Sequence, residues 1–416
     1  MQTKSKRKYL AVVTSFENNR SFNAFINGFG FIIDKICEKF EKIYIINVAN
    51  LKLFSEKKKV FDYKLNRNFE LPHNIEFYSP QNSNDFKNFM KEKELVVIND
   101  FGTRIPELRI FFLFKQHKIK QVQISYVTNV PYYNWGPLKK SFFKNLLWKF
   151  KHVYAHKFTV LLSNLGLISK IDIRFVTNPD IIMYTKTNSN IYRKFVNSLE
   201  LSFAKEFILI NGRSYDQLRS NKTAVDENQI VLLDEQLDEP QYSQFRKLLD
   251  KKQTQDHYYK LNKMLKQLSN IYNKKIIVCI HPADDLELKK KYFLDFEVVK
   301  YQTRKNIYKA FMVLFFQSTA IVDAIILKKR VATIVSNTMD KNQMLAGFQW
   351  IKALGIEKID IENNLIVDAN NKNTFLLKLD KATKNYSSFI NSYITVDGAN
   401  LGYEKIINTL KSRFFN

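Results

Sequence analysis

The stretch from Lys274 to Ser336 constrains the fold more than any other, because it reads as two strand–turn–helix units in succession. The first unit runs from the apolar segment IIVCI, residues 276–280, into the turn HPADD, residues 281–285. The second runs from VLFFQ, residues 313–317, through Ser-Thr-Ala into the helix-like IVDAIIL, and the strand-like VATIVS follows. Short apolar runs followed by helical periodicity indicate parallel strands of an α/β sheet.

Polar residues follow both of these predicted strands. His281-Pro282 ends the first strand, and Ser318-Thr319 ends the second. In open α/β sheets, ligands bind at the carboxyl ends of the strands. Hydroxyls and free backbone N–H groups at a helix start favour an anion, and an imidazole adds a donor or a positive charge. We therefore predict a phosphate site formed by His281, Pro282, Ser318 and Thr319.

Each of these residues also has a simpler interpretation. Ser318 or Thr319 is of the type that caps a helix, and His281 before Pro282 could merely close a strand. Short motifs often match by chance when they are taken singly. Their occurrence together, at successive strand ends, favours the phosphate site.

The length of 416 residues predicts about two domains. Apolar segments near residues 9–16, 42–48 and 95–100 alternate with helical patterns, which predicts a first doubly wound domain. The whole chain is predicted to be α/β, with two Rossmann-like doubly wound domains facing a cleft. We place the domains at residues 1–203 and 204–396, followed by a C-terminal helix at residues 397–416.

A candidate catalytic acid ends one strand of the first domain. LVVIND ends at Asn99-Asp100, just before Phe101-Gly102, so the Asp100 carboxylate is predicted to point into a crevice. An ordinary turn aspartate beside a glycine is the alternative. Glu17 and Asp234 are the next candidates for a general base. The acidic segment that contains Asp234 has no metal-ligand spacing, and we predict no metal site.

Charge and cysteine content narrow the class of protein. The chain has 66 Lys and Arg against 40 Asp and Glu, a net charge of +26, which attracts polyanions. The sequence has no aromatic RNA-binding signature, zinc-ligand spacing or basic tail interleaved with glycine, so no specific nucleic-acid partner is predicted. Cys37 and Cys279 are the two cysteines, and such sparse usage suits a reducing, cytoplasmic compartment.

The segments VLLDEQLDEP, DHYYKLNKMLKQL, KKIIVCIHPADD, YQTRKNIY and FFQSTAIVDAIILKKRVATI, in that order, resemble a known family. They look like the second domain of bacterial surface-polysaccharide glycosyltransferases of GT-B fold. Those enzymes share an HP motif and a later Ser-Ser or Ser-Thr motif with bacterial sialyltransferases and related Kdo transferases. The resemblance covers roughly residues 230 to 336, whereas the first domain matches only in architecture.

The resemblance implies an enzyme that transfers a sugar from a nucleotide-activated donor to a surface glycan or lipid-linked glycan acceptor. The donor would be a substrate rather than a cofactor, with CMP-linked sialic acid or a Kdo-like sugar as examples. His281, Ser318 and Thr319 would bind the donor phosphate. Sialyltransferases of this type take the general base from an acidic pair followed by Gly, and Asn99-Asp100-Phe101-Gly102 departs from that pattern by an Asn and an inserted Phe.

The glycosyltransferase mechanism predicted from these residues needs no metal. A carboxylate takes the proton of the acceptor hydroxyl, and donors aimed at the leaving phosphate stabilise its charge. Transfer of an alcohol phosphate from a CDP-alcohol and epimerisation of a sugar nucleotide are alternative enzyme functions. A basic nucleic-acid-binding protein is the alternative from another class.

Residues 137–160 are predicted to form a basic amphipathic helix that lies on an anionic membrane at the cytoplasmic face, or else packs in the core. If it binds membrane, the wild type will sediment with anionic liposomes more than with neutral ones, and added salt will weaken this binding without abolishing it. A Lys140/Lys144/Lys151→Glu variant will lose it, because each lysine contributes about 1 kcal/mol near an anionic surface. Equal sedimentation of the folded variant would assign the segment to the core.

Overall fold

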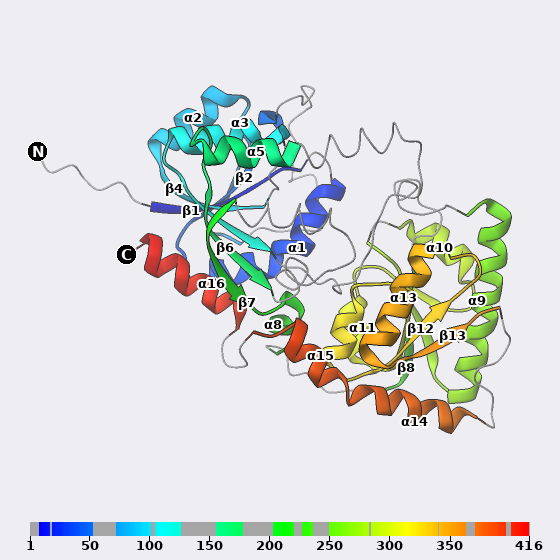
Figure 1. Cartoon of the computed structure of the whole chain (residues 1–416). Coiled ribbons are helices and arrows are strands. Elements are labelled where there is room, and N and C mark those ends of the chain that lie inside the picture. The colour runs from blue at the N-terminus through cyan, green and yellow to red at the C-terminus, as the bar shows by residue number, and fades with distance from the viewer. Residues whose placement is uncertain are drawn as a thin grey trace, which may run out of the picture. The chain divides into compact units, whose positions relative to one another are not determined.

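The computed structural model describes most of the chain, in ranges that together form two compact units (Figure 1). The described residues are 8–16, 19–52, 72–100, 105–125, 155–177, 203–219, 227–235, 249–282, 284–339, 341–362, 371–396 and 401–415. The first unit holds the described residues up to 125, those from 155 to 211 and those from 396 onward; the second holds residues 212–395.

The first unit is built on a seven-stranded sheet in the order β3-β2-β1-β4-β5-β6-β7, and every neighbouring pair is parallel. Its strands are β1 (Lys8–Thr14), β2 (Ile43–Asn47), β3 (Ile75–Tyr78), β4 (Glu94–Asn99), β5 (Lys120–Ser125), β6 (Ile171–Thr177) and β7 (Ala204–Ile210). All five residues of β2 are buried, as expected for a parallel strand covered on both faces. The strand order reverses direction between β1 and β4, which is where doubly wound sheets bind ligands.

Helices cover both faces of this first sheet (Figure 1). On one face lie α2 (Ser83–Glu92), α3 (Leu108–Gln116) and α5 (Ala155–Asn164), which share one apolar cluster with the sheet. On the other face lie α1 (Asn19–Cys37) and α16 (Gly402–Leu410), which share a second cluster. A short 3-10 turn (Ala49–Leu51), another (Ile105–Glu107) and a π-helical turn (Lys411–Phe415) complete the unit.

The second unit is built on a six-stranded parallel sheet in the order β10-β9-β8-β11-β12-β13. Its strands are β8 (Gln229–Leu233), β9 (Lys275–Cys279), β10 (Glu297–Val299), β11 (Ala310–Phe315), β12 (Arg330–Val335) and β13 (Glu357–Asp360). The order reverses between β8 and β11, so this sheet has its own switch point. The fold is therefore α/β with two Rossmann-like units, as predicted.

The helices of the second unit also lie on both faces of its sheet. An apolar cluster on one face includes α11 (Thr303–Tyr308), α12 (Ile321–Ile326), α13 (Lys341–Leu354) and α15 (Tyr386–Tyr393). The cluster on the other face includes α9 (Lys251–Tyr272), and residues of α14 (Lys372–Thr383) occur in both clusters. Two short helices, α8 (Arg213–Arg219) and α10 (Leu286–Tyr292), follow β7 and β9 in the chain.

The structure corrects the domain boundaries predicted from the sequence. The segment after residue 203 was expected to open the second domain, but it forms β7, which pairs with β6 in the first sheet. The unit boundary therefore follows Asn211. The helix expected as a separate C-terminal element is α16, whose Ile406, Ile407 and Leu410 are buried in the core of the first unit.

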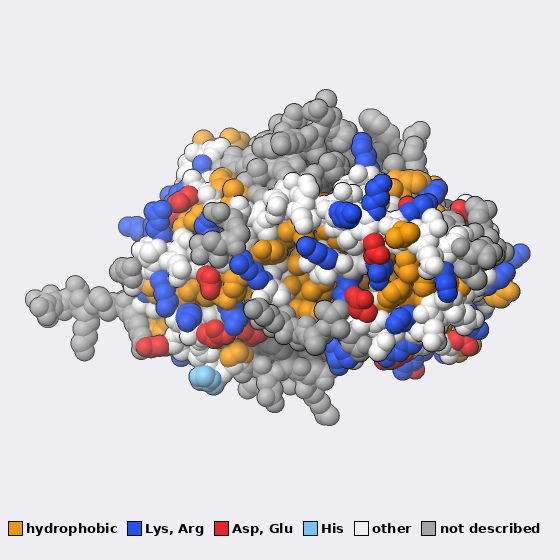
Figure 2. Space-filling view, turned by 90° about the horizontal axis from the view of Figure 1, so that it is seen from below, with side chains coloured by type: hydrophobic (Ala, Val, Ile, Leu, Met, Phe, Trp, Pro, Cys, Tyr) orange, Lys and Arg blue, Asp and Glu red, His pale blue; other side chains and the backbone are white. Residues whose placement is uncertain are grey.

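Two further expectations concern membranes and charge. Among the described residues, no helix is long and apolar enough to cross a bilayer. The predicted membrane-binding helix at 137–160 lies outside the described residues as far as position 154, and positions 155–160 belong to α5. On the face seen in Figure 2, Lys and Arg side chains are scattered among acidic and apolar ones instead of forming one stripe.

Candidate functional site

The His281-Pro282 turn lies directly beyond β9, at the carboxyl edge of the second sheet. The backbone N–H of His281 donates a hydrogen bond to Asp284 Oδ2 (3.2 Å), and the N–H of Asp284 donates to the His281 carbonyl oxygen (2.9 Å). Asp284 is buried, whereas the side chains of His281 and Pro282 are exposed. The buried Asp284 therefore holds the backbone of the turn, and the His281 imidazole lies at the surface.

Two side chains named in the phosphate prediction follow β11 at the same edge. Ser318 is half-buried, and its Oγ accepts a hydrogen bond from the backbone N–H of Ala320 (3.3 Å). This contact holds the turn before α12, but Ser318 is not the helix cap weighed as the alternative, because the N-cap of α12 is Ala320 and has no side-chain cap hydrogen bond. Thr319 is exposed, so its side chain lies at the surface.

His281 and Ser318 do not follow neighbouring strands, which corrects the expectation that they do. The sheet order places β8 between β9 and β11. Two strand spacings separate β9 from β11, roughly 10 Å. The reason is topological, because β8 starts the sheet and the chain adds strands on one side of it and then on the other. A single phosphate or a diphosphate would thus lie over the end of β8.

The end of β8 carries an acidic pair that the sequence assigned to a loop. Asp234 and Glu235 are both buried. The ammonium of Lys289, on α10, lies 2.6 Å from Asp234 Oδ2. Burial raises the pKa of Asp234, while the charge of Lys289 and its hydrogen bond act in the opposite direction. Asp234 is therefore the partner of a buried cation, which argues against its use as a general base.

Lys289 is the residue of this site that the sequence analysis missed. It stands within the run Lys289-Lys290-Lys291, so composition does not distinguish it from its exposed neighbours. One signal is present: Lys289 is three residues after Leu286 and four before the buried Phe293, so it falls on the inward face of its helix.

Asp100 lies directly beyond β4, at the carboxyl edge of the first sheet and at its switch point beside β1. Its backbone N–H donates to the Val13 carbonyl oxygen (3.0 Å), and the Thr14 hydroxyl donates to Asp100 Oδ2 (2.8 Å). Asp100 is therefore at a strand end as predicted, and Thr14 orients its carboxylate. Phe101, Gly102 and the alternative base Glu17 lie outside the described residues.

The Asp100 carboxyl group has an unusual proton affinity. Burial raises its pKa to about 7, and the Thr14 hydroxyl opposes this rise only in part. An acid with a pKa near the operating pH can accept a proton from a hydroxyl and release it again. The electrostatics of Asp100 therefore suit a general base.

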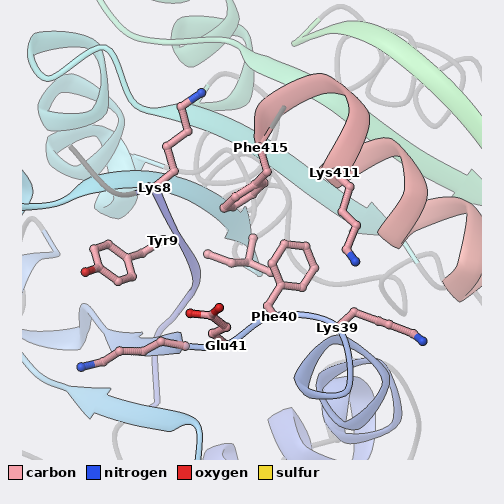
Figure 3. A pocket seen from close by; sticks show the side chains of 9 residues that line it. Lys8, Tyr9, Lys39, Phe40, Glu41, Lys411 and Phe415 are labelled. Carbon is pink, nitrogen blue, oxygen red and sulfur yellow. The ribbon is translucent and has the colours of Figure 1, made fainter. Parts of the chain in front are cut away.

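A cavity in the first unit lies at the opposite edge of the sheet, at the amino ends of β1 and β2. It has a volume of about 280 Å³ and is lined by Lys8, Tyr9, Leu10, Lys39, Phe40, Glu41, Lys42, Lys411 and Phe415. The rings of Phe40 and Phe415 pack edge to face in its lining, with their centroids 5.1 Å apart (Figure 3). Since Asp100 is at the carboxyl edge, this cavity belongs to a different part of the first unit.

No group of three or more His, Cys, Asp or Glu side chains is arranged to hold a metal ion within the described ranges.

Two Rossmann-like units, each with polar residues at the carboxyl edge of its sheet, define a GT-B-like fold. No protein-family model matches the chain, and no curated protein sequence matches it. Several solved structures match the chain over nearly its whole length. A variant of the wall teichoic acid polymerase TagF has a TM-score of 0.51 and 10% identity, over 98% of this chain and 89% of that one.

Two further solved structures are similar over nearly the whole chain. A protein provisionally assigned as a UDP-N-acetylglucosamine 2-epimerase from Listeria monocytogenes has a TM-score of 0.50 and 11% identity, over 99% of this chain and 97% of that one. MurG from Acinetobacter baumannii has a TM-score of 0.45 and 7% identity, over 98% and 99%. At such low identity, the likenesses to the TagF variant and to the Listeria protein establish the fold alone.

The pKa of Asp100 leads to a prediction about stability. Its folded pKa, about 7, exceeds the ordinary 3.8, so the folded state binds this proton more tightly than the unfolded state does. The tighter binding of this proton therefore adds to the free energy of unfolding below pH 4, and this contribution is lost as the pH rises toward 7. The free energy of unfolding of the wild type should fall more steeply across this interval than that of Asp100→Asn.

Carboxyl ¹³C chemical shifts will check the same pKa directly. A Thr14→Val variant should raise the midpoint further, because it removes a hydrogen bond to the ionised form. Glu92→Gln, which changes an exposed acid on α2, is the matched control for the unfolding experiment. An Asp100 midpoint near 4 would contradict the predicted shift.

Proposed function

We propose that this protein is a glycosyltransferase that moves a sugar from a nucleotide-activated donor to a surface glycan or lipid-linked glycan acceptor. One observation carries the proposal: His281 and the Ser318-Thr319 turn flank the end of β8 at the switch point of the second sheet. Open α/β sheets bind nucleotides at such points. CMP-linked sialic acid and Kdo-like sugars are the donors that the sequence resemblance suggests.

The second unit supplies stabilisation of the leaving group in this proposal. The exposed His281 imidazole donates a hydrogen bond to a donor phosphate oxygen, as a neutral group or as a cation. The Thr319 hydroxyl adds a second donor from the other side of β8, while Ser318 shapes the turn that presents it. Donors aimed at the phosphate favour the transition state, in which negative charge accumulates on the departing nucleotide.

The first unit supplies the base. The Asp100 carboxylate takes the proton of the acceptor hydroxyl as that oxygen attacks the anomeric carbon of the donor sugar. Thr14 holds the carboxylate in one orientation through its 2.8 Å hydrogen bond. The bond between the sugar and the donor phosphate breaks, and the nucleotide leaves as an anion. No step of this proposed mechanism uses a metal ion.

Epimerisation of a nucleotide sugar is the second candidate, since the likeness to the Listeria protein extends over 99% of the chain. Transfer of an alcohol phosphate from a CDP-alcohol is a third. Mass spectrometry of products distinguishes them: a glycosyltransferase lengthens the acceptor by one sugar, an epimerase leaves the mass of the donor unchanged, and the third reaction adds an alcohol phosphate. Peripheral attachment to an anionic membrane remains part of the proposal, through residues 137–160.

Substitutions at the second carboxyl edge test nucleotide binding. His281→Ala and a Ser318→Ala/Thr319→Ala double variant should stay folded but lose affinity for the best ligand among CMP, CDP, UDP and GDP. Each lost charge-assisted hydrogen bond should cost about 1.5–3 kcal/mol, read by calorimetry. His73→Ala, an exposed histidine on the first unit, is the control. Unchanged affinity in both site variants would disprove the phosphate site.

Replacement of the base should separate binding from turnover. Asp100→Asn is expected to keep donor affinity and to lower the rate of sugar transfer by about 10²–10⁴-fold, since the amide cannot accept the proton. The rate profile of the wild type should rise with pH as Asp100 ionises near 7. Near-normal turnover in this variant would assign the base to another residue.

A further inference from the structure

A buried cation lies under the end of β8. Lys289 projects from α10, and 2% of its side chain is exposed. An ammonium has three N–H donors, and all three are used. They reach Asp234 Oδ2 at 2.6 Å, the Glu235 carbonyl oxygen at 3.1 Å and the Tyr258 hydroxyl. Each acceptor comes from β8's end or from α9, so Lys289 joins α10 to both.

The acids around Lys289 outnumber it. Asp234 and Asp284 have side chains that are 0% and 1% exposed, and Asp284 Oδ2 lies 3.8 Å from the ammonium. The second oxygen of each carboxylate is buried with no hydrogen-bond partner among the described residues. Glu235 is also buried, and its backbone carbonyl oxygen accepts from Lys289. Lys289 is thus a cation in contact with both Asp234 and Asp284, and removing it would take one positive charge from beside these two carboxylates.

Lys289 is also linked to the His281 turn. The ammonium attracts the Asp284 carboxylate, which accepts a hydrogen bond from the His281 backbone N–H. The backbone N–H of Asp284 donates to the His281 carbonyl oxygen. Two residues after β10 hold the same turn from its other side: Lys300 donates to the Asp284 carbonyl oxygen (2.6 Å) and Tyr301 donates to the Pro282 carbonyl oxygen (3.3 Å). The position of His281 thus depends on the orientation of the Asp284 carboxylate.

The acidic group at the end of β8 makes this edge unfavourable for an anion. β8 stands between the strands that lead to His281 and Ser318, so a phosphate contacted from both sides would lie over Asp234 and Glu235. Like charges repel strongly when they are shielded from water. A phosphate site at this edge therefore requires a counter-charge beneath it.

We propose that Lys289 is a positioning residue of the donor site: its buried ammonium holds Asp284 under the His281 turn and balances the charge of Asp234 at the end of β8, so that this edge accepts a nucleotide phosphate. The proposal rests on the glycosyltransferase function above. Lys289 itself touches no substrate and acts through Asp284 and Asp234.

The groups that face Lys289 predict how its loss will depend on pH. They are Asp234 and the backbone carbonyl of Glu235 beyond β8, Asp284 before α10, and Tyr258 with His257 on α9. Burial lowers the pKa of Lys289, but the charges of Asp234, Tyr258 and Asp284 outweigh this and hold it well above its ordinary value, so the wild-type cation persists throughout the neutral range.

Without Lys289, the pKa of Asp234 rises further, because the lysine charge and hydrogen bond lower it in the wild type. The ionised Asp234 carboxylate, no longer balanced by Lys289, repels the nucleotide. Lowering the pH favours its protonated form and so reduces the repulsion. The defect of a Lys289→Met variant should therefore shrink as the pH falls.

The experiment measures the affinity of CMP and UDP by calorimetry at pH 6, 7 and 8, always as the ratio of variant to wild type. This ratio cancels the titration of the nucleotide phosphate, which is common to both proteins. Lys289→Met should bind at least 10-fold more weakly at pH 8 and regain affinity relative to the wild type as the pH falls. The double variant Asp234→Asn/Lys289→Met should bind more tightly than Lys289→Met at pH 8, with a flatter pH profile. Lys290→Met, which changes the exposed neighbour paired with Glu287 at 2.8 Å, should match the wild type.

A second readout requires no nucleotide. Hydrogen exchange at the His281 amide should be at least 10-fold faster in Lys289→Met, after correction for any change in global stability, and unchanged in Lys290→Met. If Lys289→Met does not fold, the Asp234→Asn/Lys289→Met double variant, which loses one charge of each sign, takes its place, with faster His281 exchange than in the wild type as the expected result.

The outcomes separate this inference from the function on which it rests. A wild type that binds neither a nucleotide nor a nucleotide sugar would overturn the proposed function, whatever the exchange data show. A wild type that binds, together with a folded Lys289→Met of equal affinity at pH 8, would overturn the role of Lys289 alone. An affinity loss that is the same at every pH, with unaltered His281 exchange, would also overturn it.

Discussion

Parallel strand pairing is the constraint on which the rest of the structure depends. Every neighbouring pair in both sheets is parallel, so all strands of a sheet end at the same edge. Each chain reversal is made by a crossover that covers a face of the sheet, which leaves that edge free of connections between paired strands. Residues far apart in the sequence, such as Thr14 and Asp100, are brought into contact there.

The two units give a buried acid at such an edge different partners. Asp100 has a neutral hydroxyl as its partner, and burial raises its pKa to about 7. Burial also raises the pKa of Asp234, but an ammonium at 2.6 Å opposes this rise and stabilises the ionised form of the acid. The first arrangement yields a group that can exchange a proton near neutral pH, whereas the second ties the acid to a neighbouring cation.

Much of the fold could be predicted from local sequence, because β9, β11 and β12 are short apolar runs that are bounded by polar turns. The order of the strands in the sheet could not, since nothing within the IIVCI or VLFFQ segments records that β8 lies between them. For the same reason β7 was assigned to the wrong sheet: an apolar strand has one pattern whichever sheet it joins.

Of the candidate site, the sequence predicted the residues at the strand ends but not what holds them. His281, Ser318 and Asp100 were visible as polar residues after apolar runs. Thr14 and Lys289 were not, because their importance comes from contacts across 86 and 55 positions of the chain. A lysine among three lysines gives no local sign that one of them is buried, apart from its place on the inward face of a short helix.

The position of α16 has a consequence for how the chain is made. Its Ile406, Ile407 and Leu410 cover apolar residues of β1, β2 and α1, which leave the ribosome some 360 or more residues earlier. The whole second unit is synthesised in the interval, so the part of this face that α16 covers stays exposed while the second unit is already able to fold. At ordinary rates of synthesis this delay is on the order of tens of seconds. During that time the nascent chain exposes an apolar surface to which a chaperone, or another nascent chain, can bind.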